Sequence, residues 1–455
     1  MQAKKTVLVG TLVALPVLIP VGRSMAEEGL RGTLTIGERL RSVSESGFPT
    51  PEDEGTSAVT TLNFGLTSEN ANQQLTLGLS TNIPYFFEDD DTLNSGNTLE
   101  DPAARLGYSI ENRSSRLTFD TSYRRTDVGT STFFDETINQ DVVSGAGTRT
   151  FVSARTGLTL GEDGPVTATL SHDYLRSTYS DTADPTLSDS TTHSLNGRLS
   201  FRVTPVASAF VFANWREQDQ ELATASDSTT QSIGIGGSYE ISPVTSVSAQ
   251  LSYDEDERVN SITSSSASGI GYLFGLRRAT SNGAYTFDFS STETTNGERQ
   301  EASVGRSLDL KRGSIAFTLG MSRTGDSSFE PLANLDLNYD ISETSNISAS
   351  LSQVSDIDDD DQNTIQTRLN VSYNYEINAL SSLSAGLRIA NDNELGVGSV
   401  DARTISANLS YTREVGQDWG LVSGIQYETE QNDNRADRNT RTVFVGLEKT
   451  FNFRP

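Results

Sequence analysis

Cysteine is absent from this 455-residue chain, and histidine, methionine and tryptophan are rare, with two, three and two copies. Without cysteine the protein has neither disulfides nor thiolate metal sites. His172 and His193 have no spacing that pairs either of them with a serine nucleophile or with a second metal-binding histidine. The sequence therefore predicts a protein that is not an enzyme and that is stabilised by backbone hydrogen bonds and burial.

Long hydrophobic runs are also lacking after the first residues. The one such run, residues 6–21, follows Lys4 and Lys5 and precedes Ser24-Met25-Ala26, which has the small-x-small pattern of a cleavage site. This arrangement predicts a secretory signal peptide over residues 1–26, read by the Sec pathway, and a mature chain over residues 27–455. An uncleaved anchor is the alternative, but the run is short for a membrane span.

Positive charge is scarce, since 34 lysines and arginines stand against 61 aspartates and glutamates. Removal of Lys4, Lys5 and Arg23 with the signal peptide takes the formal net charge from −27 to −30. A polyanion of this size repels the phosphates of DNA and RNA, so nucleic acid is excluded as a partner.

What the chain has in abundance is alternation of polar and apolar residues. In the stretch from Ile365 to Ile377 every odd position except Thr367 is apolar or aromatic, whereas every even position is polar. Side chains on a strand point alternately to opposite faces, so this segment has one apolar and one wet face. Similar segments recur along the mature chain and predict 20–22 strands, most simply 22, in one all-β domain with no linker.

The connections between these segments alternate in length, which indicates an up-and-down meander. Ser242-Pro243 is short and residues 254–266 are long, and the same order continues along the chain. The repeats that begin at Tyr239, Tyr339 and Tyr375 align without a gap, each as a tight turn between two strands. The repeating unit is therefore a hairpin.

A half-buried soluble sheet and a membrane barrel both explain the alternation, and three features favour the barrel. The strands reach ten residues, the length that a tilted strand needs to cross a bilayer. Their connections alternate rather than making Greek-key jumps. Aromatic residues stand near the ends of their apolar faces, as at a membrane boundary. Hydrocarbon offers no partner to free backbone groups, so the sheet must close. These aromatic positions are Tyr123, Tyr239, Tyr253, Tyr339, Tyr373, Tyr375, Tyr411, Trp419 and Tyr427.

With these patterns the whole mature chain resembles the outer-membrane β-barrels of Gram-negative bacteria. In that class the last strand ends in an aromatic assembly signal, and here the chain ends with Phe451 and Phe453, although Lys449 interrupts the apolar face and Arg454-Pro455 follow. The hairpin repeat is similar, more weakly, to barrels encoded with exopolysaccharide systems. The resemblance implies outer-membrane lipid, lipopolysaccharide and the barrel-assembly machinery as partners, and termini in the periplasm. It does not indicate an oligomeric state.

Charged residues on the wet face of the strands are the first candidates for function. Opposed arginines and carboxylates there would create a transverse field in a water-filled lumen, or would only brace the wall as ion pairs. Arg306 lies on the apolar parity of its strand, which a register error or a bulge would explain. The candidates for the lumen are Arg105, Arg124, Arg155, Arg198, Arg202, Arg368, Arg388, Asp336 and Glu376.

The long connections supply two further sets of candidates. The doublets Phe86-Phe87 and Phe133-Phe134 are expected to narrow the mouth, or to pack against its rim. Asp356, Asp358 and Asp360 imitate the start of a calcium loop, but the turn glycine and the bidentate glutamate are missing. The alternatives are a solvated loop and loosely held Ca²⁺ or Mg²⁺ that bridges carboxylates to lipopolysaccharide. No tightly bound cofactor is expected.

These features predict a porin-like channel for passive passage of small hydrophilic solutes or saccharides. The strands begin near Leu30, which leaves no room for the plug domain of energy-coupled transporters of similar strand number. Acidic loops predict a mild preference for cations. An exopolysaccharide-associated barrel and a surface protein without a transport role, such as an adhesin, are the alternatives.

Overall fold

The computed structural model describes residues 29–47, 53–87, 99–127, 133–135, 137, 140–142, 147–182, 187–221, 227–259, 264–357, 363–395, 401–432 and 435–454. Within these ranges the chain forms one sheet of 22 antiparallel strands and one small two-stranded sheet. No helix among the described residues is long and apolar enough to span a membrane.

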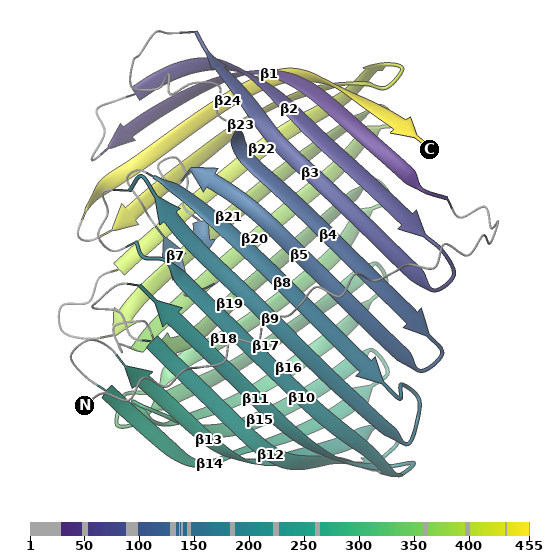
Figure 1. Ribbon diagram of the computed structural model, residues 1–455, viewed down its shortest axis with the longest axis vertical. Coiled ribbons are helices and arrows are strands. Elements are labelled where there is room, and N and C mark those ends of the chain that lie inside the picture. Colours follow the sequence, from purple (N-terminus) through teal and green to yellow (C-terminus); the bar gives the residue numbers. More distant parts are fainter. Residues whose placement is uncertain are drawn as a thin grey trace, which may run out of the picture.

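The strands follow one another around the wall in chain order, as the meander predicts (Figure 1). The first eleven strands of the wall are β1 (Arg31–Gly47), β2 (Asp53–Glu69), β3 (Gln73–Phe86), β4 (Glu100–Asn112), β5 (Ser115–Asp127), β8 (Thr148–Leu160), β9 (Val166–Ser180), β10 (Ser190–Thr204), β11 (Ala207–Gln220), β12 (Asp227–Ser242) and β13 (Thr245–Val259). The other eleven are β14 (Ser264–Thr280), β15 (Gly283–Thr294), β16 (Gly297–Leu310), β17 (Gly313–Thr324), β18 (Glu330–Ser342), β19 (Ser345–Ile357), β20 (Asn363–Asn378), β21 (Ser381–Leu395), β22 (Asp401–Gly416), β23 (Trp419–Asn432) and β24 (Arg435–Phe453).

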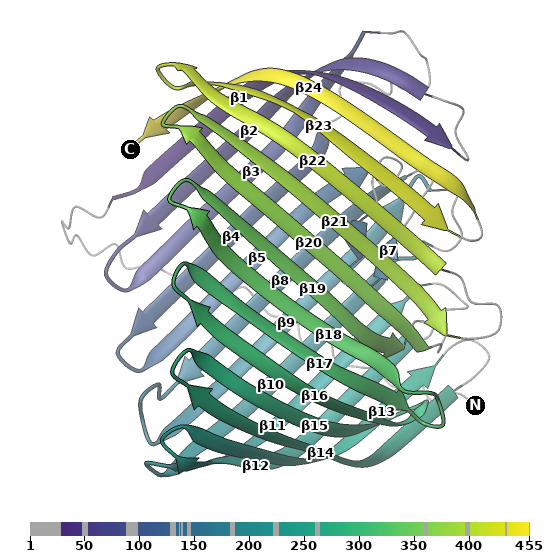
Figure 2. The same cartoon turned by 180° about the vertical axis from the view of Figure 1, so that it is seen from behind.

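The barrel closes where the first strand pairs with the last. The β1–β24 register runs from Gly32 opposite Phe453 to Gly47 opposite Arg438, along nearly the whole length of both strands. Figure 2 shows this seam with β1 and β24 side by side. Because an unpaired backbone group in hydrocarbon costs several kcal/mol by order of magnitude, this seam is what makes the sheet compatible with a membrane.

The predicted strand number is confirmed, but the strands are longer than the alternation suggested. They contain between 12 residues, as in β15, and 19 residues, as in β24. Ten residues are enough to cross a bilayer at the usual tilt, so the strands continue beyond it. The connection expected over residues 254–266 is therefore mostly strand, and only residues 260–263 lie between β13 and β14.

The two rims of the barrel differ in their connections. The turn rim, where β1 begins and β24 ends, carries tight turns such as residues 243–244 between β12 and β13. The loop rim carries the longer connections, such as residues 128–147 between β5 and β8. The predicted alternation fails at two places, because residues 295–296 alone join β15 to β16 at the loop rim and residues 433–434 alone join β23 to β24 there.

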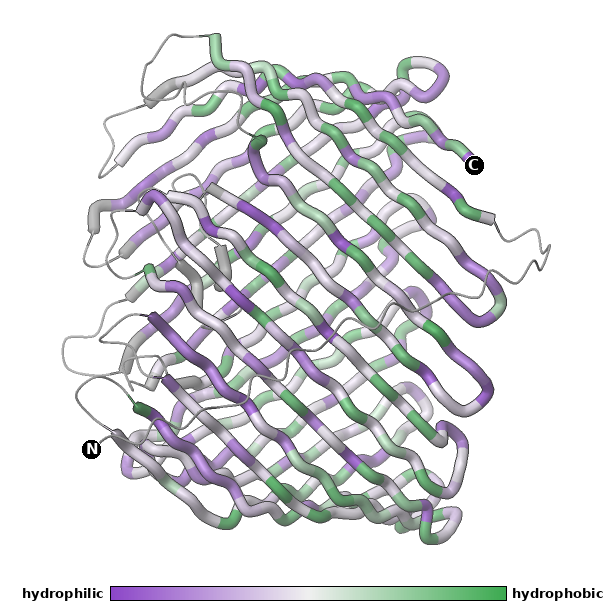
Figure 3. Tube along the Cα trace, in the orientation of Figure 1, coloured by the Kyte–Doolittle hydropathy of each residue, from purple (hydrophilic) through white to green (hydrophobic). Residues whose placement is uncertain are grey.

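Hydrophobic side chains cover the outside of the barrel instead of filling a core. Large apolar residues such as Ile235, Leu319 and Ile425 are more than half exposed. Along the strands hydrophobic and hydrophilic residues frequently alternate (Figure 3). The nine aromatic residues predicted to end the apolar faces all stand on this outer parity. Glu38 of β1 is a charged residue on this mainly apolar outer face, and its carboxylate accepts a hydrogen bond from the Thr60 hydroxyl.

Candidate functional site

The inner wall of the barrel is polar, and the strand register identifies it. Residues paired across two strands point to the same side, and successive residues point to opposite sides. A concave cavity of about 340 Å³ is lined by inward residues of β1–β5, β23 and β24, among them Arg39, Thr61 and Glu428. From these residues the pairings between neighbouring strands show which residues of every other strand point inward. We call these positions the inward parity of a strand and the alternate positions its outward parity.

The wall from β4 to β11 is rich in arginine. The predicted lumen residues Arg105, Arg124, Arg155, Arg198 and Arg202 all have the inward parity. The Arg155 guanidinium forms an ion pair with the carboxylate of Asp173, and the guanidinium of Arg198 lies 3.5 Å from the centre of the Phe210 ring. These contacts hold two of the arginines against the wall.

Opposite this wall lie strands β18 to β23. The charged residues on their inner face are mainly carboxylates. The predicted residues Asp336, Glu376, Arg368 and Arg388 lie here, again with inward parity. The Arg368 guanidinium is 4.0 Å from the Asp392 carboxylate. Inward carboxylates of this wall are Asp336, Asp340, Glu376, Asp392, Glu414, Glu428 and Glu430. Charges of opposite sign therefore face each other across the lumen.

A groove of about 510 Å³ runs across this acidic wall from β17 to β22. Asp336 and Arg388 are its charged residues, and the remaining lining is short and mostly hydroxyl or amide. Two of the hydroxyl groups in the groove, those of Ser348 and Ser372, hydrogen bond to each other at 2.6 Å. These short side chains offer many hydrogen-bonding groups to a solute and occupy little of the space in the groove.

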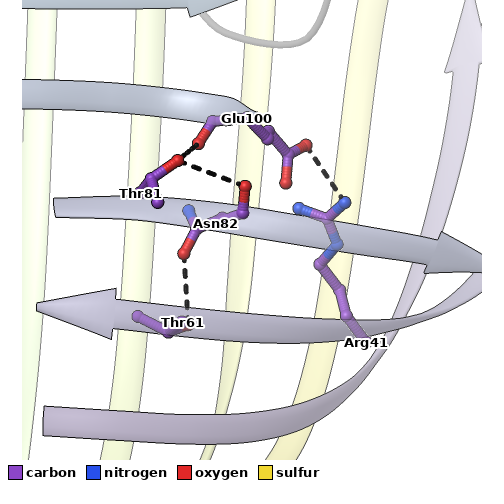
Figure 4. A network of polar contacts seen from close by, with 5 residues as sticks. All are labelled: Arg41, Thr61, Thr81, Asn82 and Glu100. Atoms are coloured by element: carbon purple, nitrogen blue, oxygen red, sulfur yellow. Dashed lines mark hydrogen bonds and ion pairs between the residues drawn. The ribbon is translucent and has the colours of Figure 1, made fainter. Parts of the chain in front are cut away.

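A polar network braces the wall near the loop rim at β1–β4 (Figure 4). Arg41 donates to the Glu100 carboxylate at 3.2 Å, and Thr61 donates to the Asn82 side chain at 3.1 Å. The Thr81 hydroxyl lies 3.4 Å from the backbone oxygens of Asn82 and of Glu100. These residues come from four consecutive strands, so the network ties the wall together where the β3–β4 register shifts.

One element of the described chain leaves the wall and crosses the mouth. Strands β6 (Phe133–Asp135) and β7 (Gln140–Val142) form a hairpin within the connection from β5 to β8. In both views β7 lies within the outline of the barrel near the loop rim (Figures 1 and 2). Cα atoms of β7 approach those of β21 to within 8 Å. Because β21 lies far around the barrel from β5 and β8, the hairpin spans the lumen.

The tip of this hairpin is fixed to β10. The Thr137 hydroxyl hydrogen bonds with that of Ser190, and the Thr192 hydroxyl donates to the Thr137 carbonyl oxygen at 3.1 Å. All three side chains are buried. Sequence reasoning missed this hydroxyl clasp, because serine and threonine are abundant and nothing in their spacing marks these three.

Beside the clasp, Arg149 of β8 is buried with 2% of its surface exposed. Its Nε and Nη2 donate to the Ser177 hydroxyl at 3.0 and 2.7 Å, and its guanidinium lies 4.8 Å from the centre of the Phe151 ring. This arginine was not among the predicted lumen residues. Its burial follows from its place on the inner wall near the hairpin.

The two predicted phenylalanine doublets lie in different parts of the structure. Phe133 and Phe134 form two of the three residues of β6, in the hairpin across the mouth. Phe86 ends β3 on the inward parity. The Phe87 ring lies edge-on to that of Tyr85, an outward residue, with the ring centres 5.8 Å apart. Phe87 is therefore directed away from the mouth.

The predicted cation ligands fall largely outside the described residues. Asp358 and Asp360 lie in the range 358–362, and Asp356 belongs to β19. Elsewhere in the described part of the chain no group of three or more histidines, aspartates and glutamates is arranged to hold a metal ion.

The two histidines meet on the outer face. His172 of β9 and His193 of β10 have outward parity, and their rings stack with centres 5.9 Å apart. The Tyr174 ring lies 5.0 Å from that of His193. The pair thus belongs to an aromatic group on the outer face, where Leu170 and Leu195 are apolar outward neighbours.

The two residues that interrupt the predicted apolar face both lie at the turn rim against aromatic rings. The Lys449 Nζ lies 5.3 Å from the Trp419 ring centre and 5.2 Å from that of Phe451. Neither the register error nor the bulge suggested for Arg306 is present, since the β15–β16 and β16–β17 pairings are regular along their length. Near a rim such side chains extend their charge toward the headgroups while their stems stay in the apolar layer. Phe451 and Phe453 themselves are outward, and the Phe453 ring stacks on Phe64 with centres 6.3 Å apart.

Comparison with solved structures supports the fold. The chain is similar to a ferric enterobactin receptor mutant from Pseudomonas aeruginosa, with a TM-score of 0.53 at 11% identity, over 94% of this chain and 82% of that one. It is also similar to the FrpB iron transporter from Neisseria meningitidis, with a TM-score of 0.56 at 11% identity, over 92% of this chain and 81% of that one. No protein-family model and no curated protein matches the sequence.

Closure, the apolar outer face and the polar inner face together define the class of the molecule. The chain is a closed 22-stranded β-barrel with the architecture of bacterial outer-membrane barrels. At 11% identity, the likeness to the two structures concerns the fold alone.

Proposed function

We propose that this barrel is a channel for passive passage of hydrophilic solutes, including saccharides, and that its mouth is narrowed by the β6–β7 hairpin. The observation that carries the proposal is the inner wall, which is polar and charged from β1 to β24. The β6–β7 hairpin is the element of the described chain that crosses the lumen. Barrels of 22 strands are wide enough to need a plug or a constriction, and the hairpin would serve as one.

The opposed charges give the channel its chemistry. The arginine-rich wall of β4–β11 faces the carboxylate-rich wall of β18–β23, so a solute crossing the lumen experiences a transverse field. The serine- and asparagine-rich groove of β17–β22 matches a polyhydroxylated solute, which exchanges hydrogen bonds with water for hydrogen bonds with the wall. With the net negative charge of the chain, this predicts a mild cation preference.

The setting of the channel completes the proposal. Residues 1–26 direct export through the Sec pathway and are removed, and the assembly machinery reads Phe451 and Phe453. The termini and the turn rim lie on the periplasmic side, and the protein performs no catalysis. Acidic connections at the loop rim hold Ca²⁺ or Mg²⁺ loosely beside lipopolysaccharide.

Conductance of the refolded mature protein in a planar bilayer tests the channel. Stable conductance steps are expected, and removal of residues 130–144 should raise the size of each step. The double variant Ser190→Ala with Thr192→Val should add noise to the steps, because it removes the hydrogen bonds of these two hydroxyl groups with Thr137 at the hairpin tip. Ser348→Ala, a hydroxyl deletion in the distant groove, is the control.

A folded barrel that inserts but stays electrically silent, with and without the hairpin, would overturn passive transport. It would then favour an exopolysaccharide exporter that needs a partner, or a surface protein. Uptake of ferric enterobactin or of iron, suggested by the names of the two similar structures, would appear as tight binding of that ligand with no conductance.

A further inference from the structure

A row of two arginines and a tyrosine stands on the outer face at the turn rim. Arg278 of β14 pairs with Tyr285 of β15, which pairs with Arg306 of β16. The three side chains therefore lie side by side and point to the same side of the sheet. One outward position closer to the middle of the barrel, the same strands carry apolar residues, namely Leu276, Phe287 and Val304. The row marks the edge of the apolar belt.

Arg306 is held in a defined position within this row. Its guanidinium carbon lies 4.0 Å from the Tyr285 ring centre. Its Nη1 donates to the Thr280 hydroxyl and its Nη2 to the Asn282 side-chain oxygen, both at 3.0 Å. Thr280 ends β14 and Asn282 lies in the turn, so the charge is drawn toward the rim. These two bonds leave three of the five guanidinium N–H donors for another ligand.

The row carries positive charge without a protein counter-ion. In the described part of the chain neither Arg278 nor Arg306 forms an ion pair, and the acceptors of Arg306 are neutral. The Arg278 side chain is exposed. Guanidinium groups remain charged at every accessible pH, and at the edge of hydrocarbon a charge needs a partner of opposite sign. Lys311 and Arg312, in the turn after β16, add to the positive charge nearby.

The same strands have the opposite charge at the other rim. Near the loop rim the outward parity of this sector carries Glu255 and Glu257 on β13 and Glu298 on β16. An anionic headgroup is thus attracted to the turn rim of β14–β16 and repelled from the loop rim. The phosphate of a phospholipid fits this pattern, because arginine binds phosphate through several parallel N–H bonds.

We propose that Arg278, Tyr285 and Arg306 form a binding site for the phosphate of an anionic phospholipid in the leaflet at the turn rim. Tyr285 supports the Arg306 guanidinium from one side. The acyl chains of the lipid would then lie along the apolar belt beside Leu276, Phe287 and Val304. The site serves retention of a lipid at the barrel surface and does not depend on whether the lumen conducts.

Native mass spectrometry of the detergent-solubilised barrel tests the site, with phosphatidylglycerol as the probe and phosphatidylcholine as the neutral comparison. The unaltered protein should retain phosphatidylglycerol preferentially. R278Q and R306Q should each weaken that binding about five-fold, since a basic residue near a membrane surface contributes about 1 kcal/mol. Arg277→Gln is the matched control, because Arg277 is the adjacent residue in β14, is exposed and has inward parity.

Any of the following results would overturn the proposal. The first is equal retention of the two lipids, the second is unchanged binding in the double variant R278Q/R306Q, and the third is an equal loss in R277Q. Stronger retention of lipid A than of phosphatidylglycerol would contradict the phospholipid assignment. The change in gel migration on heating verifies that each variant is folded. Should the double variant not fold, R306K, which keeps the charge but loses the paired Nη contacts, should weaken binding less than R306Q.

Discussion

The outer and inner faces of the same strand differ in what they contribute to this protein. On β13, Leu251 points outward and is 52% exposed, whereas the preceding residue, Gln250, lines a cavity of about 390 Å³ on the inner wall. The outer residue is exposed to water in the isolated molecule but to lipid in a membrane. The inner residue meets water in both. Stability in the membrane therefore depends on the outer face, and the inner face is free to carry charge and function.

The largest effect is expected from reversing this division on β13. Leu251→Arg places a charge at the middle of the apolar belt and should lower the free energy of unfolding by about 2–4 kcal/mol. Gln250→Arg adds the same side chain on the other face and should stay within about 0.5 kcal/mol. Urea unfolding of the barrel in lipid vesicles measures both. Equal losses would mean that the two faces share one environment.

The inner face should be sensitive at only a few packed places, and Gly236 of β12 is one of them. Phe210, 7% exposed, lies over Gly236, and a Cβ there would meet its ring and come within 2.8 Å of the Ala249 carbonyl oxygen. Gly236→Ala should therefore cost about 1–3 kcal/mol by overpacking.

Gly78 of β3 provides the control for that substitution. It has the same inward parity, but a Cβ there would have no atom within 4 Å. Gly78→Ala should be neutral, or stabilising by about 0.4–1 kcal/mol through the unfolded chain. The same urea experiment compares the two alanine variants. A cost at Gly78 equal to that at Gly236 would contradict a role for the contact with Phe210.

The smallest effect is expected from single charges in the groove. Asp336→Asn should lower the cation preference of the channel and Arg388→Gln should raise it, because each variant removes one charge from the same wall. The shifts in reversal potential across a salt gradient should be small and should fade as salt rises, since at 0.15 M charges are screened beyond about 8 Å. Shifts of the same sign in both variants would exclude a direct electrostatic effect.

The sequence predicted the number, order and facing of the strands, but it predicted the connections and the place of Arg306 less well. Alternation has a period of two in any half-buried strand, so strand number, order and facing follow from it, as they do at Asp336 and Arg388. It overestimated the connections, because the parts of a strand outside the membrane need no apolar face. It also suggested a register error or a bulge at Arg306, because an arginine on the outer parity is unfavourable unless the rim and Tyr285 are close.

By itself the sequence determined that this chain is a β-barrel with one apolar and one polar face, because hydrophobic periodicity is a local property that each strand carries. Only the tertiary structure decided which residues meet across long distances in the chain. Closure brings Gly32 opposite Phe453, the Thr137 hydroxyl bonds to Ser190, and the row at the turn rim joins Arg278 to Arg306. Such contacts depend on the strand register and on the path of one hairpin across the lumen, and no local pattern encodes either of them.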